Sequence, residues 1–180
     1  MNAIYIKKHR LSEAEVIALE VWKKLKMHCP KGKCKIAGSI RRRKKEVKDI
    51  EIVCVPNRIN GDFFGFKKIN HPAFVKAVKG IGKVTTGNIE DGKQVKIELY
   101  QHDIKIDLFM VEEGNFGMQF LIRTGPSEYS RKILWKFNQR GYRCEGGYPA
   151  NGKNRLAFFN EKEIFEFLEM KYVEPEKRKG

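Results

Sequence analysis

The sequence predicts an α+β fold, in which a sheet-bearing lobe of residues 1–115 precedes a smaller helical lobe of residues 116–180. Three observations favour this class. Apolar residues recur at helical spacing in the first thirty residues, they alternate with polar residues in short segments up to about residue 111, and helical spacing returns after residue 125. The boundary is soft, because no Pro- or Ser-rich linker marks it.

The helical segments have recognisable start and stop signals. Four helices are expected, at residues 13–27, 71–78, 127–140 and 160–170. Ser12 and Glu15 form the pattern of a capping box before the first helix, and Asn160 is a favourable N-cap for the last one. Glycine ends the second and third helices.

Short alternating or β-branched segments predict the strands. They are residues 34–37, 49–55, 95–100, 104–111 and 156–159. The segment at residues 49–55 is the clearest, because Ile50, Ile52 and Cys54 alternate with other side chains before Pro56. The loop at residues 101–103 has a suitable length for a hairpin between the third and fourth strands.

Composition limits the class of protein. A hydrophobic content of 41% can form a real core, which excludes a disordered tail. Lys and Arg number 37 against 22 Asp and Glu, a net charge of +15 that attracts polyanions such as nucleic acid or nucleotides. Cys29 and Cys34 with His28 supply only three possible zinc ligands, which favours free cysteines. Without an apolar run or a signal peptide, we expect a cytoplasmic or nucleoid-associated monomer away from membranes.

Three acidic residues are candidates for a metal site. Side chains alternate across a strand, so Asp49 and Glu51 point to one face while Ile50 points to the core. Asp107 is placed in the same way in its own strand. If the two strands are neighbours, the carboxylates converge, and a divalent cation such as Mg²⁺ or Mn²⁺ would relieve their repulsion. The alternative is that these acids are the solvated face of an antiparallel sheet.

A candidate phosphate site precedes the acids. Gly38 and Ser39 end the strand at residues 34–37, and Ser39 lies ten residues before Asp49. Glycine lets the backbone approach a phosphate closely, and a Ser hydroxyl with free N–H groups can bind an anion. Arg41 and Arg42 follow and supply fixed cationic donors for phosphate oxygens.

These motifs resemble the signature of the polymerase-β-type nucleotidyltransferases. The matching runs are Gly38-Ser39-Ile40-Arg41-Arg42, Asp49-Ile50-Glu51 and Lys105-Ile106-Asp107. Further runs make the chain similar to the family X DNA polymerases over nearly its whole length: residues 8–12, Arg123-Thr124-Gly125-Pro126, residues 161–165 and residues 171–175. The resemblance implies a catalytic palm at residues 1–115, with a mixed or antiparallel sheet and helices on one face. It also implies a small helical lobe with a short hairpin at residues 116–180, which closes on nucleotide and DNA.

The resemblance also implies roles for individual residues. Asp49, Glu51 and Asp107 would be catalytic and hold two Mg²⁺ ions, with Mn²⁺ as a substitute. The nucleotide would contact Arg10, Gly38, Ser39, Arg42, Lys48, Thr124, Gly125, Ser127 and Ser130. DNA would contact Arg41, Arg43, Lys44, Lys45, Lys105, Arg131 and Lys132, with Lys67, Lys68, Arg140 and residues 177–179 as further candidates. We also predict that the Gly125–Pro126 bond is cis.

The function implied is a template-directed DNA polymerase that transfers nucleotides from a dNTP to a primer 3′-hydroxyl, filling short gaps in DNA repair. The sequence departs from the family at Glu51, where Asp is usual, and at Ile122-Arg123, where an aromatic pair is usual. Metal preference and sugar discrimination are therefore open. Alternatives are a nucleotidyltransferase that acts on RNA, a protein or a small molecule, and a non-catalytic nucleic-acid-binding module. For Phe63, Phe64 and Phe66 a hydrophobic cluster is favoured over a base-stacking platform.

Overall fold

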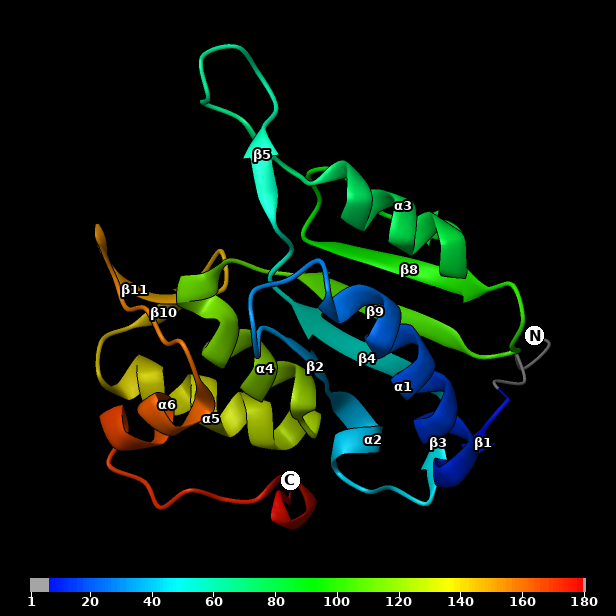
Figure 1. Cartoon of the computed structure of the whole chain (residues 1–180). Coiled ribbons are helices and arrows are strands. Elements are labelled where there is room, and N and C mark those ends of the chain that lie inside the picture. Colours follow the sequence, from blue (N-terminus) through cyan, green and yellow to red (C-terminus); the bar gives the residue numbers. More distant parts are fainter. Residues whose placement is uncertain (1–6, 180) are drawn as a thin grey trace, which may run out of the picture.

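The main sheet has five strands. We describe residues 7–179 from a computed structural model. The strand order is β2 (Cys34–Ile36), β4 (Asp49–Cys54), β9 (Lys105–Met110), β8 (Gln94–Leu99) and β7 (Gly82–Thr86) (Figure 1). Strands β4 and β9 are parallel, and the other neighbours are antiparallel. The sheet is therefore mixed, and the α+β class is confirmed. Strands β8 and β9 form the predicted hairpin.

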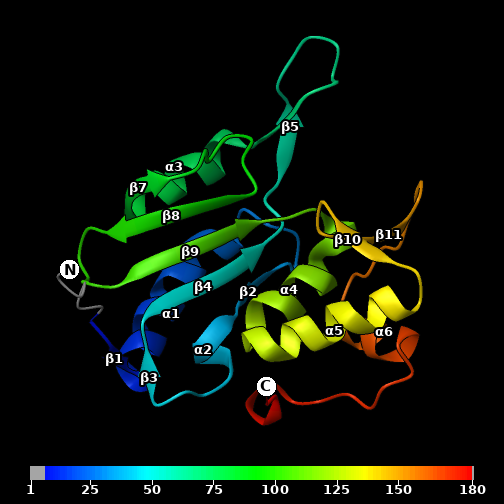
Figure 2. The same cartoon turned by 180° about the vertical axis from the view of Figure 1, so that it is seen from behind.

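Helices α1 (Leu11–Lys26) and α3 (Pro72–Ile81) cover one face of this sheet (Figures 1 and 2). The buried residues of α1 are spaced three or four apart, which makes a single apolar stripe. That stripe packs with α3 and with the inward side chains of the strands. The residues include Ala14, Ala18, Val21, Leu25, Phe74, Val78, Ile50, Ile52, Ile106 and Leu108. Cys29, Cys34 and Cys54 are buried in the same core.

The C-terminal lobe consists of three helices and a small antiparallel sheet. The helices are α4 (Phe116–Thr124), α5 (Ser127–Gln139) and α6 (Glu161–Phe167). The sheet is β10 (Arg143–Glu145), β11 (Tyr148–Asn151) and β12 (Asn154–Arg155). The helices enclose a second core that contains Met118, Leu121, Ile133, Phe137 and Phe165.

Helix α4 joins the two lobes. Phe116 packs with Val53 and Phe109 on the second face of the main sheet, whereas Met118 and Leu121 belong to the C-terminal core. Helices therefore cover one face fully and one end of the other face. The predicted boundary after residue 115 stays a prediction, because α4 contributes to both cores.

Two smaller strand pairs complete the N-terminal lobe. Strand β1 (His9–Arg10) pairs with β3 (Glu46–Val47), and β5 (Arg58–Asn60) pairs with β6 (Lys68–Asn70). The β5–β6 hairpin projects away from the rest of the chain in Figure 1.

Short 3₁₀ helices lie at Glu113–Asn115 and Pro175–Lys177. No helix described between residues 7 and 179 is long and apolar enough to span a membrane.

Several local predictions were wrong. Helix α1 begins at Leu11, so the N-cap is Arg10 and Ser12 lies inside the first turn. The carboxylate of Glu13 accepts from the Arg10 backbone N–H at 3.3 Å, replacing the predicted capping box. Residues 38–41 form a one-turn helix, α2 (Gly38–Arg41), where the end of a strand was expected.

Residues 156–159 are not a strand, and several elements were not predicted. The Phe158 backbone instead accepts from Gly117 N–H at 2.8 Å and donates to the Gly114 carbonyl at 2.7 Å, which fixes it against the start of α4. The longer unpredicted elements are β7 and α4. The short strands β1, β3, β5, β6 and β12 and the two 3₁₀ helices were not predicted either, and the hairpin of β10 and β11 was implied by the resemblance without bounds. Strand β7 is a largely exposed edge strand with no alternating pattern, and α4 is apolar on both sides because it serves two cores.

Candidate active site

The parallel pairing of β4 with β9 brings the three predicted carboxylates together. Glu51 is the direct neighbour of Asp107, and Asp49 precedes Glu51 by two residues on the same face. All three side chains are half-buried, whereas Ile50 and Ile106 between them are buried in the first core. This convergence was predicted on the condition that the strands are neighbours.

The carboxylates repel one another in a partly desolvated setting. Burial, and then the charge of Asp107, raise the pKa of Asp49 above its ordinary value. Burial and the charge of Asp49 raise the pKa of Glu51 to about 7, although Arg42 and Arg123 oppose the shift. Lys96, which pairs with Asp107 across β8, lowers the pKa of Asp49 only in part. The sequence analysis overlooked Lys96.

The donor set fits a hard divalent cation. It contains carboxylate oxygens only, and a bound cation would offset their repulsion. Within residues 7–179, no three His, Cys, Asp or Glu side chains are yet arranged to hold an ion. The Glu51 carboxylate instead lies over Gly38, with Oε2 1.7 Å from the position that a Cβ would take. Gly38 is favoured for its backbone conformation, at φ +63°, whereas a Cβ there would first meet the flexible end of the Glu51 side chain.

A cavity of about 740 Å³ opens beside the carboxylates. Its lining includes Ser39, Arg42, Lys44, Lys45, Glu46, Lys48, Asp49 and Glu51. The Ser39 hydroxyl oxygen and Arg42 Nε are buried and have no hydrogen-bond partner in the part of the chain that the structure describes. Buried polar groups normally have partners, so these two atoms are suited to a polar ligand.

A second cavity, of about 370 Å³, shares Arg42 and Glu51 with the first and extends onto the C-terminal lobe. It is completed by Ile122, Arg123, Gly125, Pro126 and Ser127. The Gly125–Pro126 bond is cis, as predicted. The two cavities thus place five predicted nucleotide-binding residues around Glu51: Ser39, Arg42, Lys48, Gly125 and Ser127.

The structure places the other predicted nucleotide-binding residues differently. Arg10 is exposed at the start of α1 and lines neither cavity. Thr124 is fully buried and donates to the Phe120 carbonyl at 2.7 Å. Ser130 is also buried and donates to the Ile122 carbonyl at 2.9 Å. Their roles toward a nucleotide stay predictions, because both hydroxyls already have protein partners.

Arginines from α2 and its C-terminal end tie the two lobes together. Arg41 makes a two-pronged ion pair with Glu161, at 2.8 and 2.5 Å, and donates to the Thr124 hydroxyl at 2.7 Å. Arg42 Nη1 donates to the Thr124 carbonyl. Arg178, whose side chain is fully buried, pairs with Glu161 at 3.0 Å. Arg41 and Arg178 thus have structural partners that their assignment to a DNA surface did not anticipate.

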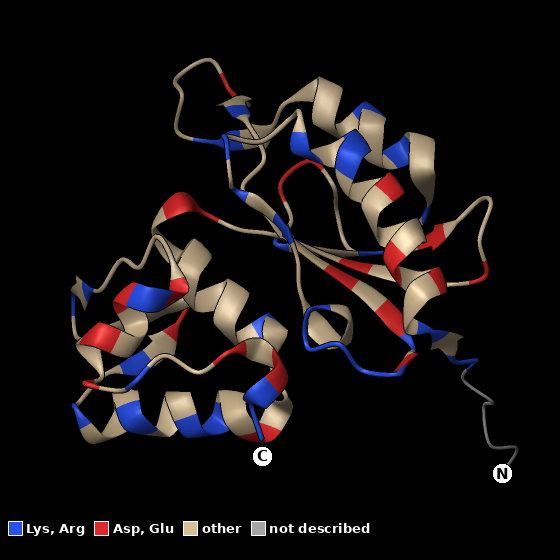
Figure 3. Cartoon of the chain, turned by 60° about the horizontal axis from the view of Figure 1, so that its bottom comes forward, with Lys and Arg blue, Asp and Glu red and all other residues tan. Residues whose placement is uncertain are grey.

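Most of the remaining predicted DNA-binding residues lie on exposed surface, whereas Arg140 is half-buried and donates to the Leu168 carbonyl at 3.1 Å. Some form ion pairs there: Arg43 with Glu15, Lys105 with Glu98, Arg131 with Glu128, and Lys67 with Asp91. Lys44, Lys45 and Lys132 are exposed. Figure 3 shows Lys and Arg on both lobes, with Asp and Glu within the strands of the N-terminal lobe. DNA contact by these residues stays a prediction.

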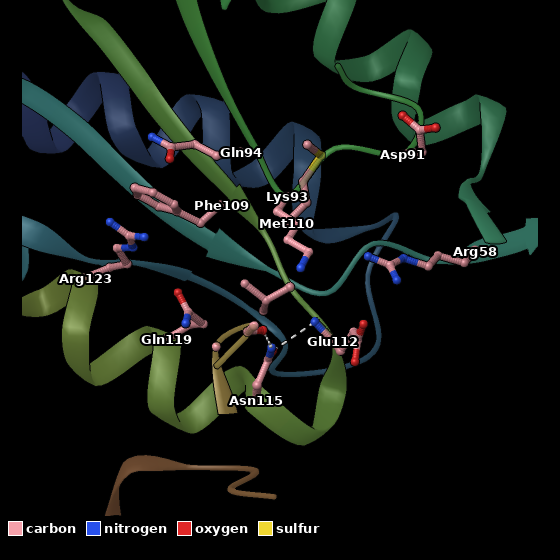
Figure 4. A pocket seen from close by; sticks show the side chains of 13 residues that line it. Arg58, Asp91, Lys93, Gln94, Phe109, Met110, Glu112, Asn115, Gln119 and Arg123 are labelled. Carbon is pink, nitrogen blue, oxygen red and sulfur yellow. Dashed lines mark hydrogen bonds between the residues drawn. The ribbon is translucent and has the colours of Figure 1, made fainter. Parts of the chain in front are cut away.

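The open face continues beyond Asp107 into a third cavity of about 320 Å³ (Figure 4). Phe109 is the next residue of β9 on that face, and the Arg123 guanidinium lies 4.1 Å from the centre of its ring. The rim includes Arg58 and Lys93. This cavity lies between the sheet and α4, so the sequence carried no local signal for it.

Comparisons with known proteins match parts of this chain to DNA polymerases. Residues 121–179 match the family model of the DNA polymerase beta thumb. The chain is also 30% identical over 101 residues to DNA polymerase IV of Saccharomyces cerevisiae, a match that covers 56% of this chain. Both matches are to DNA polymerases, so the chain resembles the family X polymerases in these regions. Its C-terminal lobe is similar to a polymerase beta thumb, and residues 161–178, including Glu161 and Arg178, belong to the matched region.

The match to the yeast polymerase spans only 16% of that protein's length. The thumb match covers α5, α6 and the small sheet, and begins within α4. The three carboxylates lie outside the thumb match, so their role depends on the geometry described above.

Proposed function

We propose that this protein is a template-directed DNA polymerase of the family X type, which transfers a nucleotide from a dNTP to a primer 3′-hydroxyl. The parallel pairing that aligns Asp49, Glu51 and Asp107 on one open face carries the proposal. The thumb supports a DNA substrate, and the net charge of +15 favours a polyanion. On this basis residues 1–115 act as the palm, and filling of short gaps in DNA repair is the corresponding role.

Asp49, Glu51 and Asp107 would hold the two divalent cations. When bound, the cations would lower the pKa of the primer hydroxyl and offset charge at the α-phosphate. The protein's own contribution is to fix these carboxylates on a rigid sheet, because Ile50 and Ile106 beneath them are buried.

The triphosphate is expected to bind between the two lobes. Ser39 Oγ and Arg42 Nε are buried donors there, and neither has a hydrogen-bond partner among the described residues. Arg42 also contacts the Thr124 carbonyl, so the phosphate site and the turn that opens the thumb helix α5 are mechanically connected. Ser127, exposed at the start of α5, lines the second cavity together with Arg42 and would contact the nucleotide there.

A primer-extension assay tests this function. Asp107→Asn should reduce the rate of nucleotide incorporation by at least about 10²-fold, because a charge that stabilises the transition state is lost. Binding of gapped DNA should be retained, and the melting temperature should not fall, since one repelling charge is removed. The measurements are single-nucleotide extension with Mg²⁺ or Mn²⁺, DNA binding by anisotropy, and thermal unfolding.

Glu98→Gln is the matched control. Glu98 lies on the same open face of β8, but outside the three carboxylates, and it pairs with Lys105 at 2.9 Å. Its variant should extend primers at nearly the wild-type rate. Full activity of Asp107→Asn would refute the proposal. Incorporation on RNA or onto a small molecule, without DNA extension, would instead support another nucleotidyltransferase, and DNA binding without any transfer would indicate a non-catalytic module.

A further inference from the structure

The tip of the β5–β6 hairpin exposes three phenylalanine rings. Phe63, Phe64 and Phe66 are 97%, 77% and 88% exposed. The rings contact one another, with centroid distances of 5.5 Å between Phe63 and Phe64 and 6.1 Å between Phe64 and Phe66. None belongs to a core of the described chain. Adjacent apolar rings that are exposed and do not pack into a hydrophobic core indicate an interaction site.

The hairpin holds these rings in a defined loop. The Asp62 carboxylate accepts from the backbone N–H groups of Phe66 at 3.0 Å and Lys67 at 2.6 Å. The Gly61 N–H donates to the Lys67 carbonyl at 2.7 Å and closes the neck of the loop. Because the backbone is ordered before binding, a ligand that packs on the rings loses little free energy to ordering them.

The charges of the hairpin favour an anionic ligand. Its basic residues are Arg58, Lys67 and Lys68, and its acidic residue is Asp62, whose carboxylate is occupied by the backbone. Lys67 pairs with Asp91, so Arg58 and Lys68 remain as cationic flanks. Aromatic faces bordered by cations are the arrangement that binds single-stranded nucleic acid, through stacking of bases and attraction of phosphates.

The position of the hairpin indicates how such a strand would reach it. Arg58 opens β5 and also lines the cavity that continues the open face of the sheet beyond Asp107 (Figure 4). Phe109 lines the same cavity, and the hairpin extends outward from that end of the sheet (Figure 1). Arg58 therefore links the base of the hairpin to the cavity at the end of the open face, and the rings lie farther out at the hairpin tip.

We propose that Phe63, Phe64 and Phe66 stack with unpaired bases of a nucleic-acid strand as it leaves the N-terminal lobe. This inference rests on the proposed function, which supplies the nucleic acid. From the sequence, a hydrophobic cluster was favoured for these three residues. Their exposure at the hairpin tip instead favours a role in base stacking. A basic, ring-tipped loop of this kind also suits an anionic membrane surface, which the test below distinguishes.

The test compares overhangs with and without bases. The variant carries Phe63→Ser, Phe64→Ser and Phe66→Ser, and its binding is measured on primer–templates with a single-stranded overhang of about eight nucleotides, within the site size of such surfaces. The overhang consists either of thymidines or of abasic sites. We expect about tenfold weaker binding or more on thymidines and unchanged binding on abasic sites, because only stacking is removed.

Tyr100→Ser is the matched control, since Tyr100 is 68% exposed at the end of β8 and far along the chain from the hairpin. It should bind both overhangs as the wild type does. Phe64→Trp provides a direct readout, because stacking on thymidine should quench the added indole fluorescence, whereas abasic DNA should not. Retained thymidine binding by the triple variant, or equal losses on both overhangs, would overturn the inference.

Two further outcomes separate this inference from its alternatives. Loss of binding to phosphatidylserine vesicles with unchanged DNA binding would overturn it in favour of a membrane. Ring-dependent DNA binding in a chain that transfers no nucleotide would uphold it while the proposed function fails. Primer extension by a chain whose DNA binding does not depend on the three rings would uphold the proposed function and overturn this inference.

Discussion

The carboxylate of Glu161 connects the two lobes through Arg41 and also pairs with Arg178 of its own lobe. Its side chain is 5% exposed and is paired with Arg41 and Arg178. Burial alone would raise the pKa of Glu161, but the hydrogen bonds and charges of the arginines outweigh it and hold the pKa below its ordinary value. The ionised form of Glu161 therefore stabilises the folded chain.

The direction of this shift predicts how stability depends on pH. The unfolded chain binds the Glu161 proton more readily than the folded chain, so the stabilisation is present above the ordinary pKa of about 4.5. It is lost as the pH falls through the lowered pKa of the folded state. Urea unfolding at neutral pH and at about pH 4 should show a decrease that Glu161→Gln reduces.

Glu161→Gln should itself cost about 3–5 kcal/mol at neutral pH, because it leaves two buried arginines without their charge partner. Glu128→Gln is the control, since Glu128 is exposed and pairs with Arg131 on the surface. Its unfolding should be close to wild type. An equal loss in both variants would show that Glu161 has no special role at the junction.

Helix α4 depends on a close approach of backbones. A Cβ at Gly117 would lie 2.4 Å from the Asn160 carbonyl oxygen, where the N-cap of α6 meets the helix. A Cβ built on Gly80, near the end of α3, would have no atom of another residue within 4 Å. Both glycines are helical, but only one is required by packing.

The two glycines therefore predict stability changes of opposite sign. Gly117→Ala should destabilise the chain by about 1–3 kcal/mol, because a backbone carbonyl cannot move aside as a flexible side chain can. Gly80→Ala should stabilise it by about 0.5–1 kcal/mol, because alanine has the higher helix propensity. Denaturant unfolding measures both changes, and destabilisation of both variants would contradict the packing argument.

The whole molecule carries a net charge of +15, and its basic residues differ in whether they are paired within the protein or exposed. Arg41 and Arg178 are occupied by Glu161, whereas Lys44 and Lys45 are exposed beside the carboxylates and line the first cavity. Affinity for DNA should therefore fall steeply with salt, and the free lysines should account for part of that dependence.

This distribution gives a prediction about salt. In the double variant Lys44→Ala with Lys45→Ala, the slope of log K against log salt should become less negative by about 1–2 units. The reason is that each phosphate contact contributes about −0.9 to the slope. Lys23→Ala with Lys24→Ala removes the same charge from α1, on the covered face of the sheet, and should leave the slope nearly unchanged. DNA titrations over a range of salt measure both. Equal slopes in the two double variants would mean that only the total charge matters.

Local patterns in the sequence were enough to predict the elements whose signals lie in neighbouring residues. Helix α1, strand β4 and the β8–β9 hairpin follow from periodicity, because burial of one face leaves a repeat in neighbouring residues. The same alternation placed Asp49 and Glu51 on one face. The resemblance of short motifs to the family X polymerases then led to the prediction of the cis Gly125–Pro126 bond.

Which distant segments meet could be seen only in the folded chain. The parallel pairing that sets Glu51 beside Asp107, the burial of Glu161 and the position of α4 between two cores depend on contacts between distant parts of the chain. The exposure of Phe63, Phe64 and Phe66 is of the same kind, since a phenylalanine has the same local pattern in a core and at a loop tip. Long-range contacts leave no short-range repeat, so these features had to be seen in space.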